Sequence, residues 1–144
     1  MIHKDMVPVF RVHGVRQGER AACGGVLLMK GSEVKALFSE PIAECGRIST
    51  VLCAVKVALE IFKKAGWASK STLVVELDNK VLFTWLVNTV QRPWGIARNL
   101  AEIDSLVCDC LSVHFQLADR MESSLAIHLA QDGINRRDWL MAWW

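Results

Sequence analysis

Three residues carry side chains that could do acid–base or metal chemistry. Asp78 ends the apolar run at residues 73–77 and precedes Asn79, where we expect a helix to begin. His13 lies in an alternating segment, and His128 lies in a segment with helical spacing. A carboxylate and two imidazoles are groups that bind Zn²⁺ or polarise a water molecule when a fold brings them together. Asp78 and His13 also have purely structural interpretations, Asp78 as a helix N-cap and His13 as a half-buried strand histidine.

The cysteines give no clear metal or disulfide pattern. There are five, and Cys108 and Cys110 stand one residue apart without a second pair at zinc spacing. Cys23, Cys45 and Cys53 fall in apolar surroundings. We interpret them as buried, reduced thiols of an intracellular protein, with a disulfide or metal site as the alternative.

Composition indicates one domain with a substantial core. The chain has 144 residues, of which 52% are hydrophobic, and a formal net charge of +2. No apolar stretch reaches the ~20 residues of a membrane helix, and the N-terminus lacks the apolar segment of a secretory signal. We expect an intracellular domain over residues 1–144, with a core at about 6–134 and a tryptophan-rich tail at 135–144.

The hydrophobic pattern predicts an α/β domain. Alternating segments joined by short turns predict three antiparallel strands, and a continuous β-branched run predicts a central strand. The expected order is β-β-β-α-β-α-α-β-α, a mixed five-stranded sheet flanked by helices, with the fourth strand parallel to the first. The strands are expected at 6–15, 21–29, 33–39, 72–77 and 112–117, and the helices at 48–65, 79–90, 95–110 and 121–131.

Several short motifs occur in a characteristic order. They are Val-His-Gly at 12–14, Gly-Gly-Val-Leu at 24–27, Ala-Leu-Glu-Ile at 58–61, Val-Glu-Leu-Asp-Asn at 75–79, Pro-Trp-Gly-Ile-Ala-Arg-Asn-Leu at 93–100 and Ala-Ile-His-Leu-Ala at 126–130. Over about residues 7–134, the chain resembles the ribonuclease-H-like domain of plant non-LTR retroelements and their domesticated relatives.

The resemblance implies a nuclease fold without its nuclease chemistry. The family's four metal-binding acids fall at His13, Val51, Asp78 and Ile127, so only Asp78 is retained. The family's loop histidine falls near Leu117. Two Mg²⁺ ions about 4 Å apart require several hard oxygen ligands, which one carboxylate cannot supply. We therefore expect a pseudonuclease with no catalytic residues, no metal and no cofactor, and keep a rebuilt hydrolase site as a weaker alternative.

The C-terminal segment suggests a protein-interaction surface. Trp139, Leu140, Trp143 and Trp144 are residue types favoured in interfaces. A protein partner or self-association would use them, and the open edges of the sheet could also pair with a partner. The alternative is that Trp139 packs back onto the domain and the rest is a tail. Two further tryptophans, at 85 and 94, are expected in the core or in helix packing.

Nucleic-acid binding without catalysis is the other functional class. Basic residues could line a groove beside Asp78 and contact RNA or an RNA/DNA hybrid. The candidates are Lys80, Arg92, Arg98 and Arg120, with Arg136 and Arg137 further along the chain. The modest net charge and the scattered basic residues favour the protein-interaction hypothesis.

Overall fold

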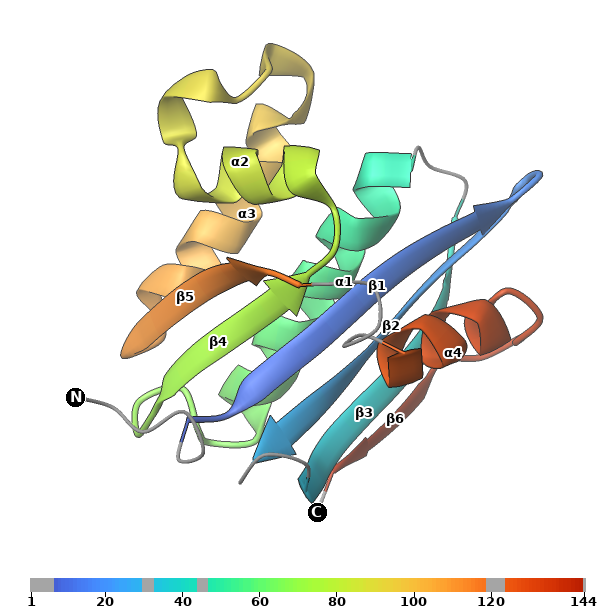
Figure 1. The fold of residues 1–144 in the computed structure, drawn as a ribbon, viewed down its shortest axis with the longest axis horizontal. Helices are drawn as coiled ribbons and strands as arrows, with labels where there is room; N and C mark the ends of the chain where they lie inside the picture. The colour runs from blue at the N-terminus through green and yellow to red at the C-terminus, as the bar shows by residue number, and fades with distance from the viewer. Residues whose placement is uncertain (1–6, 30–32, 44–46, 119–123, 144) are drawn as a thin grey trace.

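A computed structural model describes residues 7–29, 33–43, 47–118 and 124–143. These form one mixed six-stranded sheet in the order β5-β4-β1-β2-β3-β6, with helices on both faces (Figure 1). The strands are β1 Val9–Gln17, β2 Arg20–Met29, β3 Glu33–Ile42, β4 Thr72–Leu77, β5 Ser112–Leu117 and β6 Leu140–Trp143. The helices are α1 Arg47–Lys64, α2 Lys80–Val87, α3 Ala97–Cys108 and α4 Ser124–Gly133, with short 3-10 turns η2 Thr89–Gln91 and η3 Trp94–Ile96.

The predicted fold class is confirmed, with one strand added. The five expected strands and four helices are present in the expected order, and β4 pairs parallel with β1. The sixth strand, β6, lies where we expected a tail, and pairs antiparallel with β3 from Ser39↔Leu140 to Ala36↔Trp143. A four-residue segment is too short to show a reliable alternation of apolar and polar residues. Its pairing also depends on an open edge of β3, which exists only in the folded sheet.

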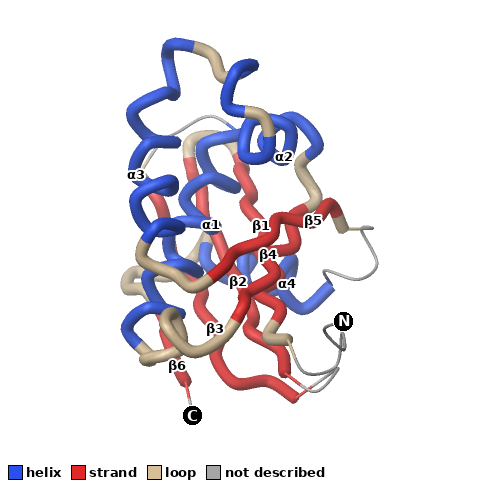
Figure 2. The backbone as a smooth tube through the Cα atoms, turned by 90° about the vertical axis from the view of Figure 1, so that its left-hand side faces the viewer, coloured by secondary structure: helices blue, strands red, loops and turns tan. Residues whose placement is uncertain are grey.

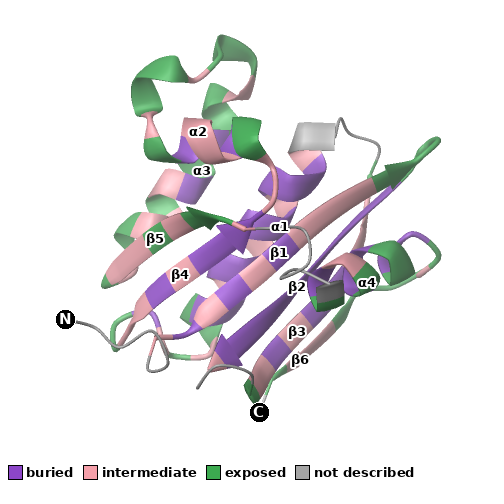
Figure 3. Ribbon diagram, viewed as in Figure 1, coloured by how far each residue is buried: buried purple, intermediate pink, exposed green. Residues whose placement is uncertain are grey.

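The sheet is covered unequally on its two faces. α1 packs on one face with α2 and α3 beside it, and α4 packs on the other over β2 (Figures 1 and 2). Successive residues of β2 therefore serve different cores: Leu27 joins the α1 side, whereas Val26 and Leu28 join the α4 side. Because β2 is covered on both faces, it is buried almost throughout (Figure 3).

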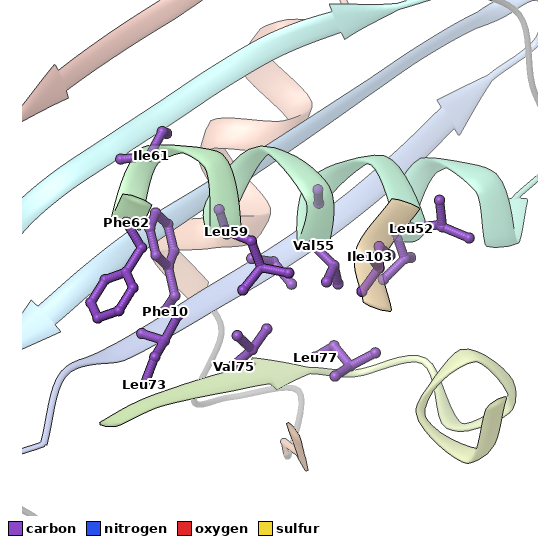
Figure 4. Packing of buried hydrophobic residues seen from close by; sticks show 14 of the residues in the cluster. Phe10, Leu52, Val55, Leu59, Ile61, Phe62, Leu73, Val75, Leu77 and Ile103 are labelled. Carbon is purple, nitrogen blue, oxygen red and sulfur yellow. The ribbon is translucent and has the colours of Figure 1, made fainter. Parts of the chain in front are cut away.

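The main core lies between α1 and the central strands. Figure 4 shows Val55, Leu59 and Phe62 of α1 directed towards Phe10 of β1 and Val75 of β4. All five side chains are fully buried. Fully burying such a side chain contributes about 1.5–3 kcal/mol, so this layer fixes the position of α1 against β1 and β4.

Two glycines allow the helices to approach the sheet closely. A Cβ added at Gly14 of β1 would collide with Thr50 and the backbone of α1. One added at Gly24 of β2 would lie 2.5 Å from the backbone nitrogen of Ala130 in α4. Gly14 and Gly24 face opposite helices, so the absence of a side chain permits close packing on both faces of the sheet.

The chain after α4 is held against β3 by polar contacts. The hydroxyl of Ser39 is fully buried and donates to the Leu129 carbonyl at 2.6 Å. The Arg136 guanidinium in turn donates to the Ser39 Oγ at 2.9 Å. Gly133 is close to β2 as well, because an added Cβ would lie 2.8 Å from the Ala22 Cβ. These contacts direct the chain back along β3, where β6 completes the sheet.

Substituting Gly24 tests the close approach of α4. We expect Gly24→Ala to lower the free energy of unfolding by about 1–3 kcal/mol, because the new methyl group must displace helix backbone rather than a flexible side chain. Gly95→Ala is the matched control, since a Cβ there meets nothing within 4 Å. Urea denaturation of both variants measures the difference, and equal midpoints would contradict the predicted packing.

Candidate functional site

The candidate site forms where β1 and β4 separate. The two strands pair from Val9↔Val74 to Arg11↔Glu76, and no register pair follows. Two residues beyond the last pair, β1 reaches His13 and the chain after β4 reaches Asp78. The parallel pairing therefore brings together two side chains that are 65 positions apart in the sequence.

His13 and Asp78 make direct contact. The His13 Nδ1 lies 3.1 Å from Oδ1 and 3.0 Å from Oδ2 of Asp78. Their side chains are 18% and 11% exposed, so this contact is largely shielded from water. Because a carboxylate only accepts hydrogen bonds, the His13 Nδ1–H is the donor in this contact.

A pocket of about 420 Å³ opens beside this pair. Its lining consists of His13, Gly14, Val15, Arg16, Val51, Asp78 and Asn79. Val51 comes from α1, whose first turns lie close to β1 because Gly14 has no side chain. The described lining offers an imidazole, one carboxylate and one guanidinium, but no serine, cysteine or lysine that could act as a nucleophile.

The N-cap interpretation of Asp78 needs correction. Asn79 is the N-cap of α2, and its side chain accepts a hydrogen bond from the Leu82 backbone N–H at 2.9 Å. Asx residues are equally suited to this position, so sequence alone could not tell which of the two neighbours caps the helix. Asp78 instead faces the pocket and contacts His13.

The other two positions of the implied metal site carry apolar residues. Val51 is 3% exposed and belongs to the main core, although it also borders the pocket. Ile127 is a half-buried residue of α4 and is not among the pocket's lining residues. Neither side chain can ligate a metal.

His13, Asp78 and His128, the three residues considered for a zinc site, do not come together. His128 is an exposed residue of α4, and His114 of β5 contacts Ser112 Oγ at 3.3 Å. Among the described residues, no three His, Cys, Asp or Glu side chains gather as a metal site requires. The donor set at the pocket does not fit a pair of Mg²⁺ ions, which need several oxygen ligands.

The candidate nucleic-acid residues differ in their availability. Lys80 at the start of α2 and Arg98 on α3 are exposed, and Arg120 lies outside the described residues. Arg92 donates to both carboxylate oxygens of Asp104, at 2.6 and 3.0 Å, and to the Trp85 carbonyl at 2.7 Å. Its guanidinium therefore links α2 to α3 through these hydrogen bonds and is not directed towards a groove. Arg136, as described above, contacts Ser39, whereas Arg137 is exposed.

The tryptophans also separate into two groups. Trp139 is 60% exposed and Trp143 is 52% exposed, with Leu140 between them partly exposed on the edge of the sheet. Trp144 lies outside the described residues. Trp85 packs against the main core, as expected, but the expectation for Trp94 is wrong, because its side chain is 97% exposed. It lies in η3 after Pro93, on a connection that extends away from the sheet (Figure 1).

Comparison with solved structures defines the fold as that of ribonuclease H. The chain superimposes on ribonuclease H1 of the archaeon Halobacterium salinarum with a TM-score of 0.81, 17% identity and coverage of 89% of this chain and 97% of the other. It superimposes on the N-terminal ribonuclease H domain of a Mycobacterium tuberculosis protein with a TM-score of 0.80 and 16% identity. This match covers 90% of this chain and 94% of the other. It also superimposes on LC11 ribonuclease H1, isolated from compost and solved with an RNA/DNA hybrid, with a TM-score of 0.82 and 16% identity. This match covers 89% of this chain and 96% of the other.

The sequence profile of the family described as Reverse transcriptase-like matches residues 11–133. The chain belongs to this family, and its domain is ribonuclease-H-like. No curated protein sequence gives a significant match. Within the described residues, no helix combines the length and apolar character needed to cross a membrane.

The role of Arg92 can be tested by stability. We expect Arg92→Met to lower the free energy of unfolding by about 1–2 kcal/mol, because the bonds to Asp104 and Trp85 are lost while the partly exposed Asp104 can rehydrate. Arg98→Met, at an exposed position, should change it by less than about 0.5 kcal/mol. Thermal and urea unfolding distinguish the two. Equal effects would place the Arg92 guanidinium in solvent.

Proposed function

We propose that this domain is a catalytically inactive ribonuclease-H-like module that acts through protein interaction, including self-association. The observation that carries the proposal is the composition of the pocket between β1, α1 and α2. Of the four positions at which the resemblance implies metal-binding acids, Asp78 alone bears a carboxylate.

The proposed inactivity has a physical basis. Two-metal hydrolysis requires one ion to activate water and another to stabilise the leaving oxygen. Here the first-strand position holds His13, which bonds to the remaining carboxylate through Nδ1. Val51 is packed in the core and its side chain carries no oxygen, so the α1 position of the implied site supplies no metal ligand.

The interaction surface that supports the proposal is the edge strand β6. It is the last strand on its side of the sheet, so one row of its backbone groups faces away from β3. Its four residues include no charge, proline or glycine, and Trp143 and Leu140 are partly exposed on it. Natural proteins protect exposed edges with charges, prolines, bulges or very short strands; β6 is short, but it has no charge, proline or bulge.

We take the partner to be a second copy of the chain. Two β6 strands related by a two-fold axis can pair antiparallel and satisfy each other's outward N–H and C=O groups. The same axis would bring the exposed tryptophans of both copies to one interface, and tryptophan is enriched at the centres of such contacts.

A second candidate is binding of an RNA/DNA hybrid without cleavage. It is favoured by the similarity to LC11 ribonuclease H1, whose structure contains such a hybrid. Arg16 lines the pocket and Lys80 is exposed one residue beyond Asn79. Trp94 is exposed enough to stack on a base.

A hybrid assay tests inactivity and the second candidate together. A labelled RNA/DNA hybrid is titrated with the protein, with and without Mg²⁺, and the same samples are run on a denaturing gel. We expect no cleavage above that of Asp78→Asn, because one carboxylate cannot hold two metal ions. Cleavage that requires Mg²⁺ and disappears in Asp78→Asn would refute the inactivity.

The binding arm of this assay uses two salt concentrations. Phosphate contacts weaken steeply as salt rises, whereas burial of tryptophan does not. Polarisation that increases with protein and collapses at higher salt would support the hybrid-binding candidate, especially if Lys80→Ala reduces it.

Self-association is tested by sedimentation velocity over a range of concentrations. We expect the wild-type chain to approach twice the monomer mass, and Trp143→Lys to remain monomeric because a charge on the edge opposes pairing. Trp94→Lys is the matched control, an exposed tryptophan on a different part of the fold. A monomeric wild type, or a dimer lost only in Trp94→Lys, would refute pairing through β6.

A further inference from the structure

Cys23 of β2 faces α1 at a point where helix and sheet are very close. It pairs with Gly14 of β1 and with Glu40 of β3. Side chains of directly opposed residues in an antiparallel pair lie on the same face. Since a Cβ at Gly14 would meet Thr50 of α1, Cys23 points towards the same helix. It is completely buried.

Cys53 belongs to α1, the helix that packs on the face of the sheet to which Cys23 points. It follows Thr50 by three residues, which places it one helical turn further along the same face of α1. The strand register and the helical spacing therefore place both cysteines between α1 and β2, and Cys23 is near enough to Cys53 to influence the pKa of its thiol. Neither takes part in a disulfide in this structure.

The two thiols differ in access to solvent. Cys53 lines a cavity of about 330 Å³ that also contacts Glu40, Lys56 and Trp139, whereas Cys23 has no exposed surface. The hydrogen bond from Cys23 lowers the pKa of the Cys53 thiol, and this outweighs burial and the nearby Glu40 carboxylate, which act in the opposite direction. A thiolate is the reactive form of cysteine, so Cys53 is the member of the pair that an oxidant reaches first.

We propose that Cys53 and Cys23 are an oxidation-sensitive pair, in which a hydroperoxide oxidises Cys53 and Cys23 then closes a disulfide between α1 and β2. The proposal concerns a modification site on the α1 face and is independent of the function proposed above.

The chemistry balances in two steps. The Cys53 thiolate attacks one oxygen of the hydroperoxide, the O–O bond breaks, and the sulfur becomes a sulfenic acid as hydroxide or alkoxide leaves. The Cys23 sulfur then attacks the sulfenic sulfur. The S–O bond breaks, water leaves with the thiol proton, and the disulfide forms. The hydroperoxide is the only oxidant, and it is reduced by two electrons.

The resulting bond would tie the sheet to the helix beside the pocket. Cys53 is two residues from Val51, and Cys23 pairs with Gly14, and both Val51 and Gly14 line the pocket. A link between residues 23 and 53 restricts the unfolded chain, and it therefore raises the thermal midpoint if the native geometry accepts it.

Peptide mapping tests the pair directly. The full chain is treated with hydrogen peroxide, alkylated under denaturing conditions and digested with trypsin without reduction. Cleavage after lysine and arginine places Cys23 in peptide 21–30 and Cys53 in peptide 48–56, whereas Cys45 falls in 36–47 and the remaining two cysteines in 99–120. We expect a linked species of 21–30 and 48–56 that dithiothreitol abolishes.

Variants establish the order of the steps. Cys23→Ala should leave Cys53 as a sulfenic acid that dimedone traps, and Cys53→Ser should leave the 21–30 peptide alkylated. Cys108→Ser, an exposed cysteine on α3, is the control and should still give the linked species. The wild-type map does not depend on the variants folding. Full alkylation of Cys53 after peroxide, or its linkage to Cys45, would overturn the proposal.

Discussion

The pairing of β1 with β4 is the contact on which the rest of the molecule depends. Only three residue pairs make it, and it joins β4 and β5 to the other four strands of the sheet. Its last pair sets Arg11 against Glu76, whose side chain is almost completely buried, with Arg11 Nε 3.6 Å from Oε1. Breaking that alignment would leave a buried carboxylate without the nearby guanidinium, so the register is strongly specified.

This register also determines what the candidate site can contain. His13 and Asp78 meet because each lies a fixed distance beyond the last β1–β4 pair. Several carboxylates gathered at this point would repel one another unless cations held them together. A single carboxylate that is hydrogen-bonded to an imidazole does not need a cation to offset such repulsion. Val51 is part of the main core and also borders the pocket. The site is stable as an ordinary part of the fold, which is consistent with the inactivity proposed for it.

The sequence predicted those parts of the fold that local patterns control. β4 is a β-branched run and β5 is an alternating segment, and both have the predicted boundaries because each ends at a clear turn or helix signal. Other features depend on partners distant in the chain. β6 needs the open edge of β3, and Arg92 finds Asp104 only when α2 and α3 pack together. Trp94 is exposed because Pro93 and η3 carry it away from the sheet, which composition alone could not show.

The same distinction applies to the candidate site. The family resemblance singled out Asp78 and His13 as site positions. Their contact, however, comes from the strand register, and the choice of Asn79 as helix cap comes from backbone geometry. The Cys23–Cys53 contact was not predicted. Their apolar surroundings indicated burial, and only the alignment of α1 over β2 shows that the two thiols face each other.

The proposed interaction surface and the proposed thiol pair share one wall of the molecule. Trp139 directly precedes β6 and Met141 belongs to it, and both line the same cavity as Cys53. A partner seated on β6 would therefore cover the opening through which a hydroperoxide reaches Cys53. A disulfide from Cys53 to Cys23 would in turn fix the α1 side of that cavity, against which Trp139 lies. If the chain both associates through β6 and is oxidised at Cys53, the shared cavity predicts that each event alters the rate or affinity of the other, although neither proposal rests on the other.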